Sequence, residues 1–158
     1  MTGVQTCALP ISREITSVEA MRKFGEALGK KLRAGDIIVL QGDLGAGKTA
    51  LTQGIGAALG FSDITSPTFV ISRIHRGAIP LIHVDAYRLL GANQNFEFDD
   101  LDLNSARESA ITVIEWGGDI VVRLSEEYLL ISITFGANEE SRIIHSEGRG
   151  VRWQGFTL

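Results

Sequence analysis

The chain has 158 residues, 44% of them hydrophobic and 22% charged, which is typical of a globular protein and excludes a disordered or collagen-like chain. Its length suits one domain with a single sizeable core. The formal net charge of −4 argues against a broad basic surface for nucleic acid, and no apolar stretch reaches the roughly 18–20 residues that span a bilayer. We therefore expect a soluble protein with no membrane contact, and any involvement with RNA should run through a partner.

The first twelve residues, MTGVQTCALPIS, show no periodicity that joins them to the rest of the chain, and TGVQTCALPI resembles a sequencing-library adapter translated in frame. We interpret residues 1–12 as a non-native scar and 13–158 as a single domain. The alternative is a native first strand. Cys7 is the only cysteine, so an intrachain disulfide and a cysteine-based zinc site are both excluded. This is compatible with a cytoplasmic location, and we expect no zinc.

A helix and a strand come after the N-terminal segment. Thr16-Ser17-Val18-Glu19 has the pattern of a capping box, and apolar residues then recur at helical spacing through Leu32, up to Gly35. The next segment, Asp36–Gln41, contains the continuous apolar run of a buried strand. The sequence therefore predicts one amphipathic helix that leads into a central strand.

A glycine-rich loop joins that strand to a second predicted helix, Thr49–Leu59, which stops at Gly60. The segment LQGDLGAGKTAL matches the P-loop pattern G-x-x-x-x-G-K-[ST] without a mismatch. Its backbone N–H groups can wrap a phosphate chain, and the helix N-terminus adds a positive dipole end. We expect Lys48 to reach the β- and γ-phosphates and the Thr49 hydroxyl to bind Mg²⁺. The predicted nucleotide-binding residues of the loop are Gly42, Asp43, Leu44, Gly45, Ala46, Gly47, Lys48 and Thr49.

The rest of the chain alternates strands with turns and ends in a hairpin. The pattern predicts strands at Thr68–Arg73, Ala78–Val84 and Ala110–Glu115, an acidic segment with helical character at Phe96–Leu103, a helix from Asp119 to Leu124, and an antiparallel pair at Tyr128–Phe135 and Arg142–His145. This order predicts an α/β fold of the three-layer P-loop NTPase type, with a mostly parallel sheet and antiparallel edge strands.

Two carboxylates stand at the ends of predicted strands. Asp85 ends AIPLIHVD, where a P-loop site commonly has its second metal anchor, although it could simply cap a helix that begins at Ala86. Glu115 ends AITVIE and could reach the same metal or orient the attacking water. We interpret His83, on the same face as Asp85, as an ordinary strand histidine outside the chemistry. Lys48, Asp85 and Glu115 are the predicted catalytic residues.

Four other features have no single interpretation. Trp116 could contact a ligand or cover the rim of the core. The turn at 65–68, with Thr68, could sense a γ-phosphate or be an ordinary hydroxyl-rich turn. The acidic run FEFDDLDL could dock a basic partner or be solvated, and the cluster of Arg149, Arg152 and Trp153 is too short to assign to RNA.

Two motifs that the sequence lacks favour one nucleotide and one type of reaction over others. No Asn-Lys dipeptide of the guanine-reading motif occurs, so we expect ATP rather than GTP. A small-molecule kinase normally has several lid arginines, and only Arg88 and Arg107 lie between Asp85 and Trp116. A kinase and a nucleotide-switched binding module that does not hydrolyse ATP remain as alternatives to an ATPase.

Four motifs together resemble one family. GDLGAGKT, TSPTFV, HVDAYRL and EWG, in this order and at this spacing, are similar to the TsaE family (also called YjeE), the bacterial ATPase of tRNA threonylcarbamoyladenosine biosynthesis. The resemblance extends from about Ile15 to Trp153. It implies ATP and Mg²⁺ as cofactors, with Thr49 and Glu115 as metal ligands and Asp85 in the Walker B role. It also implies that Thr68 and Trp116 lie near the nucleotide and that Thr16–Val18 lie near its base.

The same resemblance implies partners. TsaE proteins act with TsaB and TsaD, and TsaD transfers the threonylcarbamoyl group to adenosine 37 of ANN-decoding tRNA. ATP binding and slow hydrolysis would let that complex turn over repeatedly, so this chain would not be the transferase and would meet tRNA only indirectly. A late arginine that helps to hold the nucleotide is also expected, and Arg142 is our candidate.

Overall fold

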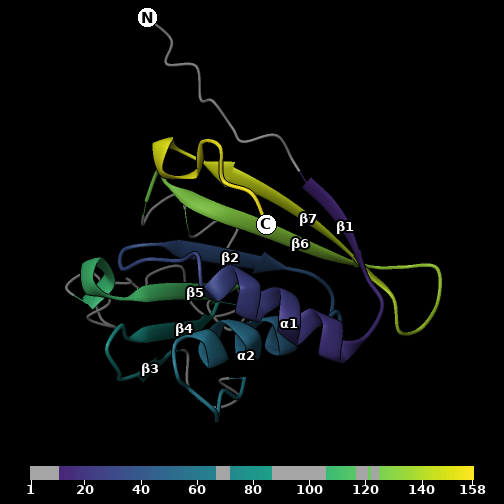
Figure 1. Cartoon of the computed structure of the whole chain (residues 1–158), viewed down its shortest axis with the longest axis horizontal. Helices are drawn as coiled ribbons and strands as arrows, with labels where there is room; N and C mark the ends of the chain where they lie inside the picture. Colours follow the sequence, from purple (N-terminus) through teal and green to yellow (C-terminus); the bar gives the residue numbers. More distant parts are fainter. Residues whose placement is uncertain (1–10, 67–71, 87–105, 117–120, 122–124) are drawn as a thin grey trace, which may run out of the picture.

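A mixed sheet of seven strands forms the centre of the computed structural model, with helices α1 and α2 lying against one of its faces (Figure 1). The structure describes residues 11–66, 72–86, 106–116, 121 and 125–158. The strands are β1 (Ile11–Ile15), β2 (Ile37–Gln41), β3 (Ser72–His75), β4 (Leu81–Asp85), β5 (Ile111–Glu115), β6 (Tyr128–Phe135) and β7 (Arg142–Arg149). The α-helices are α1 (Val18–Gly29) and α2 (Lys48–Ala58), and two short 3₁₀ helices are η2 (Arg107–Ser109) and η3 (Val151–Trp153).

The strand order is β1-β7-β6-β2-β5-β4-β3. The central strands β6, β2, β5 and β4 are parallel, whereas β1, β7 and β3 pair antiparallel at the two sides. This confirms the predicted α/β fold with its parallel core and antiparallel edges. The predicted helix at Phe96–Leu103 lies outside the described residues, and of the predicted helix at 119–124 only Val121 is described.

The strand β2 is buried on both faces because its side chains alternate between two apolar cores. Ile38 and Leu40 belong to the core beneath α1 and α2, and Ile37 and Val39 belong to the core on the opposite face. This double burial explains why the segment reads as a continuous apolar run. It also fixes the end of β2, and so the start of the glycine loop, at the middle of the sheet.

Helix α1 differs from its prediction at both ends. Its N-cap is Ser17, whose hydroxyl accepts a hydrogen bond from the Ala20 N–H at 3.0 Å. In a capping box the third residue after the N-cap is Glu or Gln, but the third residue after Ser17 is Ala20. The predicted capping box is therefore wrong, and Glu19 instead pairs with Arg22. The helix ends at Gly29, and Leu32 lies beyond it. Leu32 has helical spacing, but it reaches the core from the non-helical turn that follows α1.

Several strands also begin or end at other residues than predicted. The strand β4 begins at Leu81 rather than Ala78, since Pro80 lacks the N–H that a paired strand needs. The strand β7 continues to Arg149, well past the predicted end. Ile11 and Ser12, which we assigned to the scar, lie in β1 opposite Ser146 and His145. The interpretation of 1–12 as non-native stays a prediction.

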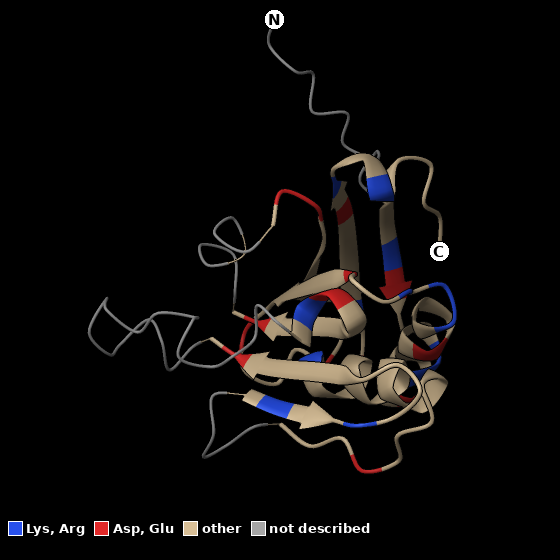
Figure 2. Cartoon of the chain, turned by 90° about the vertical axis from the view of Figure 1, so that its left-hand side faces the viewer, with Lys and Arg blue, Asp and Glu red and all other residues tan. Residues whose placement is uncertain are grey.

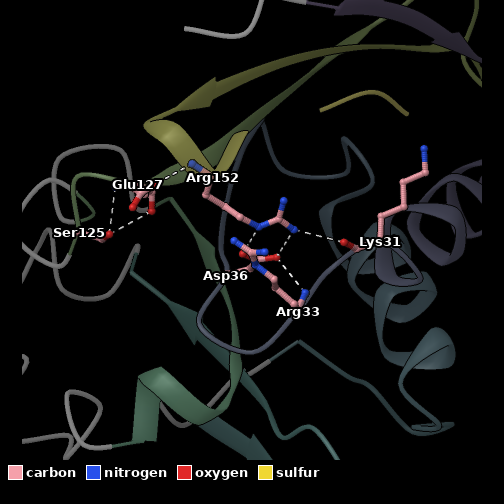
Figure 3. Close-up of polar contacts among 6 residues, drawn as sticks. All are labelled: Lys31, Arg33, Asp36, Ser125, Glu127 and Arg152. Carbon is pink, nitrogen blue, oxygen red and sulfur yellow. Dashed lines mark hydrogen bonds and ion pairs between the residues drawn. The ribbon is translucent and has the colours of Figure 1, made fainter. Parts of the chain in front are cut away.

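The C-terminal segment is held to the start of β2 by Arg152 (Figure 3). Its guanidinium donates to both carboxylate oxygens of Asp36, with Nε–Oδ1 2.8 Å and Nη2–Oδ2 2.9 Å, and to the Lys31 carbonyl oxygen at 3.3 Å. The Arg152 N–H donates to Glu127 at 2.6 Å. Next to it, the Trp153 side chain is 1% exposed in the core. Arg152 and Trp153 are therefore structural.

We expect Arg152→Ala to lower the free energy of unfolding by about 2–4 kcal/mol, because the Asp36 side chain is 4% exposed and would lose its charged partner. Urea unfolding followed by circular dichroism measures this. Arg33→Ala is the matched control, since only its backbone N–H bonds Asp36. A loss below about 0.5 kcal/mol, the usual limit for a surface substitution, would contradict the expectation.

Candidate functional site

The glycine loop between β2 and α2 has the backbone that a phosphate site requires. Gly47 is the N-cap of α2 with φ +112°, and Gly45 has φ +80°, conformations that residues with a Cβ rarely adopt. Within the segments that the structure describes, no side chain caps the first turn of α2. The N–H groups at this helix end therefore remain directed toward the loop, as anion binding at a helix N-terminus requires.

Lys48, the first residue of α2, points back over the loop. It is 7% exposed, and its Nζ donates to the carbonyl oxygens of Gly42 at 2.5 Å and Asp43 at 3.0 Å. The indole of Trp116 covers it, with Nζ 4.2 Å from the ring centroid. Burial lowers the pKa of Lys48, and the negative charges of Glu115, Asp43 and Asp85 oppose that shift. The amine is thus a desolvated cation centred on the loop.

The two predicted carboxylates stand at the ends of the neighbouring strands β4 and β5. Figure 2 shows acidic residues, in red, at the tips of strand arrows in the sheet. Asp85 of β4 is paired in register with Glu115 of β5, and paired residues of parallel strands face the same side of the sheet. Glu115 is 4% exposed, and its Oε1 lies 3.0 Å from Nε2 of His83. His83 was assigned no role in the chemistry from the sequence, yet it contacts a predicted site residue. Its position two residues before Asp85 was the available signal.

Trp116 follows Glu115 with φ +62°, the one positive value at a non-glycine residue in the described part of the chain. Its N–H donates to the Leu40 carbonyl oxygen at 3.0 Å, which ties the end of β5 to the end of β2. A bulky residue in this conformation is strained, and such strain is concentrated at functional sites. The indole lies over Lys48 and lines the same cavity, and its contact with a nucleotide stays a prediction.

These groups surround one cavity of about 460 Å³. Lys48, Thr49, Asp85, Glu115 and Trp116, predicted from three separate motifs, all line it. The remaining lining residues are Leu44, Gly45, Gly47 and Ser66. Three predicted loop residues do not line it, namely Gly42, Asp43 and Ala46, and the Ala46 side chain is instead buried in the core. Thr68 lies outside the described residues.

A second cavity of about 450 Å³ lies on the other side of the loop, against the start of α1. Ser17 and Val18 line it and Thr16 does not, and the expected nearness of these residues to a nucleotide base stays a prediction. Arg142 also lines it and donates to the loop carbonyl oxygens of Ala46 at 3.2 Å and Gly45 at 3.3 Å. Arg142 therefore holds the loop backbone, and its contact with a nucleotide stays a prediction.

The residues around the first cavity fit Mg²⁺ bound together with phosphates. Within the described ranges, no three His, Cys, Asp or Glu side chains form a group that could hold a metal ion alone. Magnesium in phosphate sites uses one or two protein ligands, waters and phosphate oxygens. The Thr49 hydroxyl and the carboxylates of Asp85 and Glu115 line the same space and can serve as those ligands.

No helix in the described part of the chain has both the length and the hydrophobicity that a membrane span needs.

A glycine loop between a buried parallel strand and a helix, facing carboxylates at two neighbouring strand ends, defines an α/β protein of the P-loop NTPase type. The model of the family described as "Threonylcarbamoyl adenosine biosynthesis protein TsaE" matches residues 15–144. The chain belongs to the TsaE family, whose proteins take part in threonylcarbamoyladenosine modification of tRNA.

Individual relatives agree with this family. The chain is 45% identical over 140 residues to the tRNA threonylcarbamoyladenosine biosynthesis protein TsaE of Streptomyces coelicolor, covering 84% of this chain and 93% of that protein. It is 41% identical to the TsaE protein of Mycobacterium tuberculosis strain H37Rv, over 97% of this chain and 88% of the relative. The crystal structure of YdiB from Bacillus subtilis superposes with a TM-score of 0.73 at 29% identity, over 91% of this chain and 88% of that one.

Proposed function

We propose that this protein binds ATP with Mg²⁺ and hydrolyses it slowly, as an accessory that acts with TsaB and TsaD in the threonylcarbamoyl modification of adenosine 37 in ANN-decoding tRNA. One observation carries the proposal: Lys48, Thr49, Asp85 and Glu115 line a single cavity at the carboxyl ends of parallel strands. In this proposal the protein works in the cytoplasm, is not itself the threonylcarbamoyl transferase, and meets tRNA only through its partners.

The described residues suggest how hydrolysis would proceed. The loop N–H groups and the N-terminus of α2 would hold the phosphate chain, and Lys48 would exchange its two loop carbonyls for β- and γ-phosphate oxygens. Bound Mg²⁺ would neutralise phosphate charge, with Thr49, Asp85 and Glu115 available as its ligands. One of the two carboxylates would orient the attacking water. Catalysis would thus rest on positioning and electrostatic stabilisation.

The site has features of an enzyme that is slow without its partners. The basic group described in the main cavity is Lys48, and Arg142 on the far side of the loop is bound to backbone carbonyls. In other P-loop proteins an arginine supplied by a partner accelerates hydrolysis by about 10³–10⁵-fold. We infer that the TsaB–TsaD complex changes the hydrolysis rate of this protein.

The test is ATP hydrolysis by the purified chain, alone and titrated with a TsaB–TsaD complex. We expect fewer than about one turnover per second alone, below the usual kinase range, and a changed rate on titration. Trp116 fluorescence should report ATP binding, because Lys48 would move from the ring face, and Trp116→Phe should remove that signal.

Other results would favour another function. Tens of turnovers per second without partners would contradict the proposal. ATP consumption only with an added acceptor metabolite, yielding a phosphorylated product, would indicate a kinase. ATP binding that changes partner affinity without hydrolysis would indicate a nucleotide-switched binding module.

A further inference from the structure

His83 lies beneath the candidate site, on β4, with its side chain fully buried. Its Nε2 is 3.0 Å from Oε1 of Glu115, whose side chain is 5% exposed. The other ring nitrogen, Nδ1, is buried and has no hydrogen-bond partner among the described residues. A carboxylate without a proton only accepts hydrogen bonds, so opposite such a group Nε2 is the nitrogen that donates. The ring is therefore oriented by its contact with Glu115.

The pairing of β4 with β5 determines where His83 and Glu115 lie. His83 is two residues before Asp85, and Asp85 is paired with Glu115, so all three side chains project from the same face of β4 and β5. On that face the strand residues that precede them, Leu81, Ile111 and Val113, are fully buried in the apolar core. His83 thus lies between that core and the Glu115 carboxylate, which lines the cavity.

A buried polar pair of this kind contributes little to stability. Removing both groups from water is costly, and an apolar pair of similar volume often packs equally well or better. What the hydrogen bond does provide is direction, since it fixes the rotation of the Glu115 carboxylate and so the position of its second oxygen. In metal and phosphate sites, hydrogen-bonded groups behind a ligand orient it in this way.

We propose that His83 is a positioning residue, which through its hydrogen bond holds the Glu115 carboxylate in the orientation that hydrolysis requires. The inference rests on the proposed ATPase function of the site. His83 does not line the cavity and acts only through Glu115.

The test compares two substitutions at position 83. His83→Leu keeps an apolar side chain of moderate size but removes the donor, whereas His83→Gln can place an amide N–H near the position of Nε2. For His83→Leu we expect the hydrolysis rate at saturating ATP and Mg²⁺ to fall about tenfold to a hundredfold. Binding of ATP in EDTA, read from Trp116 fluorescence, should change less than about twofold, and His83→Gln should restore most of the rate.

A double-mutant cycle separates positioning from general damage. In a Glu115→Gln background the carboxylate is already absent, so His83→Leu should lower the remaining rate by less than about twofold. Thr112→Val is the matched control, because it also removes a buried polar group, the Thr112 hydroxyl, but from the opposite face of β5. Its hydrolysis rate should stay within about twofold of the wild type. If His83→Leu does not fold, His83→Asn, whose shorter amide should not reach Glu115, replaces it with the same expected losses.

The possible results distinguish a failure of the inference about His83 from a failure of the proposed ATPase function. Wild-type hydrolysis with an unchanged rate in the folded His83→Leu or His83→Asn variant would overturn the inference alone. An equal loss in the wild-type and Glu115→Gln backgrounds would also overturn it, since the histidine would then act independently of Glu115. Absence of ATP binding and hydrolysis in the wild type would overturn the proposed function and this inference with it.

Discussion

Lys48→Ala is expected to reduce ATP hydrolysis by about 10²–10³-fold or more, and to weaken ATP binding as well. Lys48 is the cation that the structure places inside the main cavity, 7% exposed and directed over the glycine loop. A desolvated ammonium interacts with phosphate oxygens far more strongly than an exposed one, because little water screens it. Its loss therefore removes charge where the transition state of phosphoryl transfer spreads it.

The measurement is steady-state hydrolysis together with ATP binding by calorimetry, since the Trp116 signal itself depends on the lysine. Lys23→Ala is the control, because Lys23 is exposed on α1 and does not line the cavity. It should retain the wild-type rate within about twofold. A folded Lys48→Ala variant that kept a third of the wild-type rate would show that hydrolysis occurs elsewhere or by a contaminant.

The strand, glycine loop and helix of the P-loop pattern could be predicted because the pattern is local in the sequence. Strand, loop and helix succeed one another within about twenty residues, and the pattern itself specifies where Gly47, Lys48 and Thr49 stand. Asp85 and Glu115 could also be predicted, since strand-terminal carboxylates of a parallel sheet meet at one edge. The parallel order of β4, β5 and β2 then brings these segments together.

The contacts that the sequence could not supply join distant segments. The bond between His83 and Glu115 joins residues 32 positions apart and requires the in-register pairing of β4 with β5. The bond between Arg152 and Asp36 spans 116 positions, so Arg152 looked like part of a free basic cluster. The predicted end of α1 was wrong for a related reason. Leu32 has helical spacing, but it reaches the core from a turn after the helix.

The remaining question within the site is which carboxylate orients the attacking water, and we expect it to be Glu115. Its carboxylate is 4% exposed and held by His83, so its direction is fixed. Glu115→Gln should lower the hydrolysis rate about a hundredfold, within the range that a positioned base contributes, while ATP affinity stays within about threefold. The amide oxygen of glutamine can still accept from His83, so the fold should be preserved.

Asp85→Asn should differ from Glu115→Gln in its dependence on Mg²⁺. If Asp85 mainly anchors the metal, its loss should raise the Mg²⁺ concentration needed for half-maximal hydrolysis, with much of the rate recovered when Mg²⁺ saturates. Magnesium titrations of both variants measure this, with Glu126→Gln, an exposed glutamate outside the cavity, as the control. If Asp85→Asn lost its rate at every Mg²⁺ concentration and Glu115→Gln recovered at high Mg²⁺, the two roles would be reversed, and His83 would then position a metal ligand rather than a base.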